Sequence, residues 1–556
     1  MTKVAIIGAG PCGLSALRSF EQAEKNGEKI PEIVCFDKQE DWGGLWNYSW
    51  RTGSDQYGDP VPNSMYRYLW SNGPKECLEF ADYSFDEHFG KPIPSFPPRE
   101  VLYDYILGRV KKGNLKSKIK FNTTVTNVSY DNESFEVTYR DKKNAKTLKE
   151  VFDYVIVSTG HFSVPFIPEY PGMKAFPGRI MHSHDFRDAE EFRGKNVVVL
   201  GSSYSAEDVA LQCHKYGAKS VTIGYRHNPM GFKWPEGMKE VFHLDRLEGN
   251  KAIFKDGHVQ ETDAVILCTG YLHHFPFISE DLKLKTGNRL YPPMLYKGVV
   301  WQNNHKLMYL GMQDQFHTFN MFDCQAWFAR DVIMGKIKVP NDSEIEKDIN
   351  KWVSMEEKLE NPEQMIDFQT EYTKELHDLS DYPKIDFELI RKTFKEWEHH
   401  KVENIMTYRN KSFASPVTGS VGPIHHTPWE EAMDDSLKTF LNKCKILINE
   451  FDDLNGFLLP REIFLDKDIK DIKLDCTGSI FTSKCHYIPL NREVNIIDFI
   501  SSISIKPSKV LSPSEPRVSR KSTRASRKST RASRKSTRAS RKSTRASRKS
   551  TRASRR

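Results

Sequence analysis

Three glycines near the start of the chain, Gly8, Gly10 and Gly13, have the spacing of a dinucleotide-binding turn. Gly8 permits a tight turn, Gly10 lets the backbone approach a pyrophosphate, and Gly13 lets a helix pack closely on a strand. The pyrophosphate would lie at the helix N-terminus, where free N–H groups favour anions. Asp37 could accept hydrogen bonds from both ribose hydroxyls. The segment predicts a dinucleotide site; the alternative is a tight strand–helix turn without a ligand.

A second turn of this kind, Gly201-Ser-Ser-Tyr-Ser-Ala206, departs from the pattern at Ser203 and Ala206. The strand expected after it leads into Arg226 and His227, where an NAD-binding unit usually has an acid. A guanidinium there can pair with the 2′-phosphate of NADPH. Two such turns imply two nucleotides, and hydride transfer from NADPH to a flavin is the simplest interpretation.

Both turns lie in segments with the pattern of α/β units, and residues 196–200 are apolar enough for a sheet covered on both faces. We expect helices over 14–23, 204–214 and 344–359. We expect strands over 4–7, 33–36, 135–138, 154–158, 196–200, 220–224 and 264–268. The fold class is therefore predicted to be α/β.

The nine cysteines are scattered and include no Cys-x-x-Cys pair, which argues against a disulfide framework, a zinc site and a redox-active disulfide. The adjacent histidines at 273–274, 399–400 and 425–426 have no cysteine or acid cluster beside them, and we expect no metal site. The sequence offers no membrane-spanning run and no signal peptide, so we expect a cytoplasmic protein.

The basic charge lies almost wholly in the last forty residues. From Arg517 to the end there are 18 lysines and arginines and no acid, whereas the rest of the chain carries 64 basic and 74 acidic residues. Five copies of Arg-Lys-Ser-Thr-Arg-Ala-Ser run from Arg520 to Ser554. We expect a disordered tail. It could contact acidic partners, RNA or anionic lipid, or be phosphorylated; the alternative is a repeat expansion without a role.

A third motif, Phe176-x-Gly178-x-x-x-His182-x-x-x-Phe186, resembles the fingerprint of flavin-containing monooxygenases. Baeyer–Villiger monooxygenases carry a related fingerprint that has Trp at the last position. We interpret the segment as a linker between nucleotide domains, in which His182 is either a linker histidine or a catalytic one. The likeness is closest to trimethylamine-oxidising bacterial members and runs from residue 1 to about 442. It is carried by the segments at 41–48, 65–76, 201–208, 268–277, 311–315 and 425–429.

The resemblance implies two Rossmann-like domains, with the NADP domain inserted in the FAD domain. The FAD-binding domain would comprise residues 1–165 and 283–445, the NADP-binding domain 166–282, an extension of unknown structure 446–516, and the basic tail 517–556. It also implies a homodimer.

The family's cofactor contacts can be carried over to matching residues. FAD would be held by Gly8, Gly10, Cys12, Gly13, Asp37, Gln39, Leu45, Trp46, Asn63, Val125, Gln315 and Thr318, although Asn63 stands where relatives carry His. NADPH would be held by Trp70, Asn72, Gly201, Tyr204, Ser205, Arg226, His227 and Arg409.

The implied reaction is NADPH- and O₂-dependent oxidation of trimethylamine to its N-oxide through a C4a-hydroperoxyflavin. The Asn72 amide could hydrogen-bond the flavin peroxide and the nicotinamide, or cap a loop. Tyr204 could gate the pocket, or only pack. The Asp314 carboxylate could set the position of NADP⁺ or relay a proton, or be a solvated loop acid. Trp397 could form a wall for a methylated amine, or belong to the core.

Two other functions compete with this prediction. One is a broader N- or S-oxygenase acting on dimethylamine, dimethyl sulfide or larger amines, which would have the same nucleotide motifs. The other is an RNA- or membrane-associated protein that uses its basic tail on a degenerate flavoprotein body. Bound yellow cofactor and a substrate panel distinguish the three.

Overall fold

The computed structural model describes residues 2–442, 451–454, 457–460, 479–481 and 487–489. The chain divides into two compact units, Met1–Phe464 and Leu465–Arg556, and the fold and site below belong to the first. Two short hairpins are described after residue 450. They are β19 (Phe451–Leu454) with β20 (Phe457–Pro460), and, in the second unit, β21 (Ser479–Phe481) with β22 (Tyr487–Pro489). The predicted disordered tail lies outside the described residues.

The first sheet has seven strands in the order β16-β17-β18-β7-β1-β2-β3. The strands from β18 to β3 pair in parallel, and β16 and β17 extend the sheet by antiparallel pairing. Helix α1 (Pro11–Lys25) connects β1 to β2, as a parallel pair requires. The strands are β1 (Lys3–Ile7), β2 (Glu32–Phe36), β3 (Ile119–Lys120), β7 (Tyr154–Val157), β16 (Leu295–Tyr296), β17 (Val300–Trp301) and β18 (Leu307–Tyr309).

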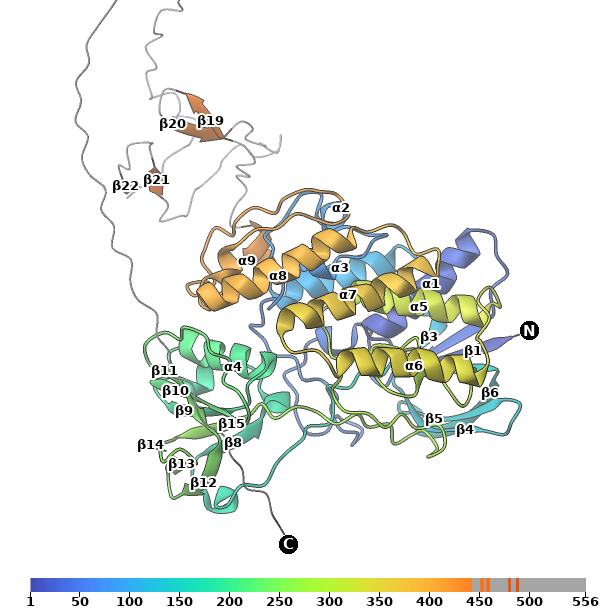
Figure 1. Ribbon diagram of the computed structural model, residues 1–556, viewed down its shortest axis with the longest axis horizontal. Helices are drawn as coiled ribbons and strands as arrows, with labels where there is room; N and C mark the ends of the chain where they lie inside the picture. Colours follow the sequence, from blue (N-terminus) through green and yellow to red (C-terminus); the bar gives the residue numbers. More distant parts are fainter. Residues whose placement is uncertain (1, 443–450, 455–456, 461–478, 482–486, 490–556) are drawn as a thin grey trace, which may run out of the picture. The chain divides into compact units, whose positions relative to one another are not determined.

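The second sheet is wholly parallel, in the order β11-β10-β9-β15-β8 (Figure 1). Val197, Val198 and Val199 in its central strand are fully buried, as the apolar run at 196–200 predicted. Helix α4 (Tyr204–Lys215) follows that strand. The strands are β8 (Arg179–His182), β9 (Asn196–Leu200), β10 (Ser220–Tyr225), β11 (Met238–Phe242) and β15 (Ala264–Leu267). The predicted α/β fold class is confirmed.

Part of the segment interpreted as a linker is an edge strand. β8 contains His182 and pairs with β15, and the His182 ring nitrogen Nε2 donates to the Gly270 carbonyl at 3.1 Å. The chain crosses between the two sheets after β7 and again after β15. The crossings run side by side, because Leu272 N donates to Val164 O and Phe166 N donates to Gly270 O. Each sheet carries a small antiparallel sheet: β4 (Thr123–Tyr130), β5 (Phe135–Asp141) and β6 (Lys146–Phe152), and β12 (Leu244–Glu248), β13 (Lys251–Phe254) and β14 (Val259–Glu261).

Helices follow the last strand of the first sheet. Helix α5 (Phe319–Ile333) is buried along its whole length. The next three helices begin at side-chain caps: Asn341 accepts from Glu344 N, Asn361 from Gln364 N, and Asp386 from Leu389 N. They are α6 (Asp342–Glu356), α7 (Pro362–Asp378) and α8 (Phe387–Glu403). The sequence predicted the first of these; α7 and α8 were not predicted. No described helix has the length and apolar character needed to cross a membrane.

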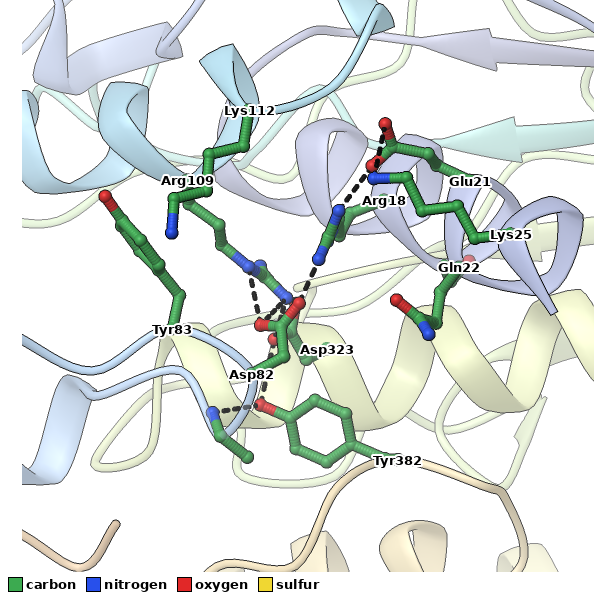
Figure 2. Close-up of polar contacts among 12 residues, drawn as sticks. Arg18, Glu21, Gln22, Lys25, Asp82, Tyr83, Arg109, Lys112, Asp323 and Tyr382 are labelled. Carbon is green, nitrogen blue, oxygen red and sulfur yellow. Dashed lines mark hydrogen bonds and ion pairs between the residues drawn. The ribbon is translucent and has the colours of Figure 1, made fainter. Parts of the chain in front are cut away.

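A buried ionic network fixes α1 against α5 and α3 (Arg99–Lys111) (Figure 2). Arg109 of α3 donates to both carboxylate oxygens of Asp323 in α5, at 3.0 and 2.7 Å, and to Asp82 at 2.8 Å. Arg18 of α1 donates to the other Asp82 oxygen at 2.9 Å, and the Tyr382 hydroxyl donates to Asp323 at 2.9 Å. Planar guanidinium–carboxylate pairs allow only a narrow range of geometries, so the helix after the first glycine turn is held in place.

Candidate active site

Close packing requires a glycine at two of the three glycine positions of the first turn, Gly8 and Gly13. A Cβ on Gly8, whose φ is +106°, would lie 2.5 Å from the Ser158 carbonyl oxygen, and one on Gly13 would lie 1.8 Å from the Gly8 oxygen. A Cβ on Gly10 would meet nothing within 3.4 Å, so the absence of a side chain there leaves room for a ligand. Gly10 is the N-cap of α1, no side chain caps the helix, and its first turn has no acid. Pro11 has no N–H and Leu14 N donates to Gly10 O at 2.9 Å, so the N–H groups of Cys12 and Gly13 are the ones left at this helix end to face an anion.

Asp37 is buried directly after β2 and lies beside the first turn. Its two carboxylate oxygens accept hydrogen bonds from Ala9 N at 2.6 Å and Gln39 N at 2.7 Å. Burial raises the pKa of the carboxyl, and the two N–H donors oppose that rise. The donors fix the direction of the carboxylate, and each oxygen keeps a further lone pair for a ribose hydroxyl.

Other residues predicted to hold FAD come from the first turn itself and from two other segments. Trp46, which follows Leu45 in the short helix Gly44–Trp46, packs edge-on against Phe319 at 5.7 Å between ring centres. Cys12 is buried against Gly311, where an added Cβ would lie 2.4 Å from the Cys12 sulfur. Gln315 and Thr318 lie in the partly buried segment that leads into α5.

Two hydroxyls test whether this region fits a flavin. The buried Oγ1 atoms of Thr159, after β7, and of Thr318, before α5, have no hydrogen-bond partner in the described part of the chain. Buried hydroxyls are costly without partners, and the polar edge of a flavin would supply them. Two other residues predicted to hold FAD, Asn63 and Val125, already contact other parts of the protein. The Asn63 amide bonds to Asn47 O and Met65 N, and Val125 lies in the core of β4.

The second turn is more open than the first. A Cβ on Gly201 would lie 2.3 Å from the Cys268 oxygen, so this glycine is required. Ser203, the N-cap of α4, and Ser205 are exposed. Arg226 follows β10 with its side chain exposed, and its Nε donates to His227 at 2.9 Å. The region thus offers a helix N-terminus and an accessible guanidinium, which fits the phosphates of NADPH.

Asn72 is presented by a short loop whose neighbours are fixed. Ser71 N donates to Pro97 O at 2.9 Å, and Ser71 O accepts from Arg409 Nε at 3.2 Å. Arg409 is buried, and its Nη2 donates to Asp208 at 2.6 Å. Trp70, also buried, packs edge-on against His425 and Phe440. Trp70 and Arg409 thus support the loop from within, whereas Arg226 is exposed.

Tyr204, Trp397 and Asp314 come together from separate parts of the chain. The rings of Tyr204 and Trp397 stack 6.1 Å apart at 24°, and Phe316 meets Tyr204 edge-on at 6.4 Å. Burial raises the pKa of the Tyr204 hydroxyl, and Glu398, Glu207 and Asp314 raise it further. Burial also raises the pKa of Asp314. The structure therefore brings Tyr204 and Trp397 into ring contact, and it places Asp314 close enough to raise the pKa of the Tyr204 hydroxyl.

Two histidines for which the sequence predicted no role connect the crossings between the sheets. His161 and His273 stack 4.5 Å apart at 11°, and donate to the carbonyls of Gly311 and Met312, at 3.2 and 3.0 Å. Burial lowers the pKa of His161 to about 3 and also lowers that of His273. Both rings are therefore neutral near pH 7. Nothing in the local sequence distinguishes them from the other histidines.

The comparisons with known families and sequences agree with this geometry. A family model described as flavin-binding monooxygenase-like matches residues 1–229 and 238–399. Trimethylamine monooxygenase from Pelagibacter ubique (strain HTCC1002) is 97% identical over 443 residues, which cover 80% of this chain and 100% of that protein. The enzyme of the same name from Methylocella silvestris is 59% identical over 445 residues, covering 80% of this chain and 99% of the relative.

Two solved structures extend the comparison. The crystal structure of Tmm from Pelagibacter sp. strain HTCC7211 has 84% identity and a TM-score of 0.78, and the match covers 79% of this chain and 100% of that one. The structure of S-allyl-L-cysteine S-oxygenase from Allium sativum has 26% identity and a TM-score of 0.64, covering 74% of this chain and 95% of that one.

Proposed function

Because the chain belongs to the flavin-binding monooxygenase-like family, we propose that it uses NADPH and O₂ to oxidise trimethylamine to trimethylamine N-oxide. The observation that carries the proposal is its 97% identity to a trimethylamine monooxygenase over the whole length of that protein. The two glycine turns and Arg226 support the choice of nucleotides. The reaction balances as amine, O₂, NADPH and one proton giving N-oxide, NADP⁺ and water.

FAD would be held at the first turn. The N–H groups at the start of α1 would bind its pyrophosphate, Asp37 its ribose, and Thr159 and Thr318 the polar edge of the ring system. When bound, the flavin supplies the redox chemistry, accepting a hydride and delivering one atom of O₂ to the substrate nitrogen. The protein's own residues orient the reactants and exclude water.

NADPH would be held at the second turn. The start of α4 would receive its pyrophosphate, and Arg226 with His227 would pair with its 2′-phosphate. The Asn72 amide would hydrogen-bond the nicotinamide amide from its anchored loop, and Asp314 would orient the same ring. Trimethylamine, which offers methyl groups and one lone pair, would pack against the faces of Tyr204 and Trp397.

A direct test uses the purified full-length chain. NADPH consumption should accelerate when trimethylamine is added, and trimethylamine N-oxide should form in equal molar amount. Consumption without N-oxide would contradict the proposal, since it would mean that reducing equivalents pass to O₂ alone.

A broader N- or S-oxygenase is the second candidate. It is favoured by the structural match to the S-oxygenase from Allium sativum at a TM-score of 0.64. A panel of trimethylamine, dimethylamine and dimethyl sulfide, compared by kcat/KM, separates the two. The homodimer, the cytoplasmic location, the domain boundaries and the contacts of the basic tail stay predictions.

A further inference from the structure

Lys401 is a buried lysine whose ammonium group lies among three aromatic rings. Its Nζ is 4.7 Å from the ring centre of Trp397, 5.0 Å from that of Tyr204 and 5.2 Å from that of Phe232. We call these three rings the aromatic box. Rings at such distances attract a cation through their quadrupoles, and the same arrangement binds methylated ammonium ions in other proteins. The box of this chain is filled by a cation of its own.

Two carboxylates complete the surroundings of this ammonium group. Lys401 Nζ lies 2.8 Å from a Glu207 oxygen, with both side chains buried, and 3.8 Å from a Glu398 oxygen. The Tyr204 hydroxyl donates to the same Glu398 oxygen at 3.5 Å. Lys401 therefore contacts the ring faces of both Tyr204 and Trp397, and it also reaches the Tyr204 hydroxyl through Glu398.

The box joins three separate segments. Trp397 and Lys401 lie one turn apart on α8, Tyr204 and Glu207 one turn apart on α4, and Phe232 comes from the loop after β10. Glu240 of β11 holds that loop, because its carboxylate accepts from Met230 N at 2.6 Å, Gly231 N at 2.9 Å and Trp234 Nε1 at 3.0 Å. Residues 230–237 are also the gap between the two stretches that the family model matches. Phe232, which forms one wall of the box, thus lies in a segment that the family model does not match.

We propose that Lys401 is a positioning residue for the amine pocket, filling the aromatic box so that Tyr204 and Trp397 form a fixed wall beside which the uncharged amine packs. The inference rests on the proposed function, which places the substrate against these two rings. N-oxygenation uses the nitrogen lone pair, which the protonated amine lacks. A box already filled by Lys401 does not capture the protonated, unreactive form.

The first test removes the cation and keeps the apolar stem. Lys401→Met should raise the KM for trimethylamine by about tenfold, because the wall loses its anchor, with kcat within about threefold. Lys401→Arg, which keeps a cation, should recover part of the loss. Lys392→Met is the matched control, since Lys392 lies on the same helix with its side chain 71% exposed. The visible flavin spectrum and Tm of each variant report folding independently of turnover.

The second test probes the box with tetramethylammonium, which has no lone pair and cannot be oxidised. It should inhibit Lys401→Met at about tenfold lower concentration than the wild type, because the vacated box and its two carboxylates recognise a cation. A flavin-loaded Lys401→Met enzyme with wild-type KM and wild-type inhibition would overturn the inference. If that variant does not fold, Phe232→Leu removes one wall without changing a charge. It should raise the KM in the same direction, and an unchanged KM would likewise overturn the inference.

The two proposals can fail separately. If the wild type makes no N-oxide, the proposed function fails. A crystal structure of Lys401→Met then tests the box, because the Tyr204 and Trp397 rings should lose their 6.1 Å stacking. Rings that keep their positions without the ammonium would show that Lys401 does not position them.

Discussion

The two glycine turns share a backbone design and differ in how deeply they are enclosed. Gly8 and Gly201 both have a positive φ, and a Cβ on either would collide with the carbonyl oxygen of the residue just after the neighbouring strand, at 2.5 and 2.3 Å. In the first turn the residue at the end of the next strand is the buried Asp37, held by two N–H donors. In the second it is the exposed Arg226.

From this difference we expect one site to retain its nucleotide and the other to exchange it. A buried carboxylate that accepts two backbone hydrogen bonds suits a nucleotide that stays bound through many turnovers. An exposed guanidinium, which pairs with a phosphate in contact with solvent, suits one that exchanges. On the proposed function, the backbone turn would select for a dinucleotide, and the residue after the following strand would select which one.

The largest effect is expected at the closest contact of the first turn. Gly13→Ala would place a methyl group 1.8 Å from the Gly8 carbonyl oxygen, and should lower flavin affinity about 10- to 100-fold. Flavin content after purification, read from the visible spectrum, measures the change. Gly287→Ala is the control, because a Cβ there meets nothing within 4 Å. Full flavin content in Gly13→Ala would show that α1 can shift without losing the site.

A more selective effect, of similar size, is expected at the second turn. Arg226→Gln should raise the KM for NADPH about 10- to 100-fold and leave flavin content unchanged, because it removes a charge-assisted contact to the 2′-phosphate. The activity with NADH, which lacks that phosphate, should not fall. Arg179→Gln, another exposed arginine of the same sheet, is the control. An equal loss with NADPH and NADH would argue against 2′-phosphate recognition at Arg226.

The crossings between the two regions should make the fold sensitive to acid. The pKa of His161 is held at about 3, below its value of about 6.5 in an unfolded chain, so the unfolded chain binds this proton more readily. The contribution of His161 to the free energy of unfolding is therefore complete above pH about 6.5, and it is lost as the pH falls from there toward 3.

Calorimetry checks this prediction. The Tm of the wild type should fall more steeply between pH 7 and pH 5 than that of His161→Gln. His274→Gln, which changes an exposed neighbour of His273, should follow the wild type. Identical slopes for His161→Gln and the wild type would rule out His161 as the source of the sensitivity.

The sequence predicted those parts of the site that depend on local spacing. Gly8, Gly201, Asp37 and Arg226 follow from a strand–turn–helix pattern within about thirty residues, and the family resemblance that they and the fingerprint indicated is confirmed. The predicted α/β fold class is confirmed. It could be predicted because the strands are short apolar runs that are visible in the sequence. The individual site residues stay predictions.

Other features depend on contacts between distant segments and leave no local pattern. From the sequence, Lys401 would be taken for an exposed residue on the surface of a helix. It is buried only because it packs against α4 and Phe232. Arg409 was expected at NADPH, and the structure pairs it with Asp208 inside the protein. The fingerprint histidine His182 was expected in a linker, yet it is the last residue of an edge strand. The strand could not be predicted, because four residues are too few to show a strand period.

The most direct test of the central claim, that two different nucleotides occupy the two turns, is anaerobic reduction followed in the visible spectrum. The purified chain should show a flavin band that NADPH bleaches rapidly, and Arg226→Gln should keep the band but lose the rapid bleaching. A protein without the band, or a band that NADPH reduces equally fast with and without Arg226, would contradict the account.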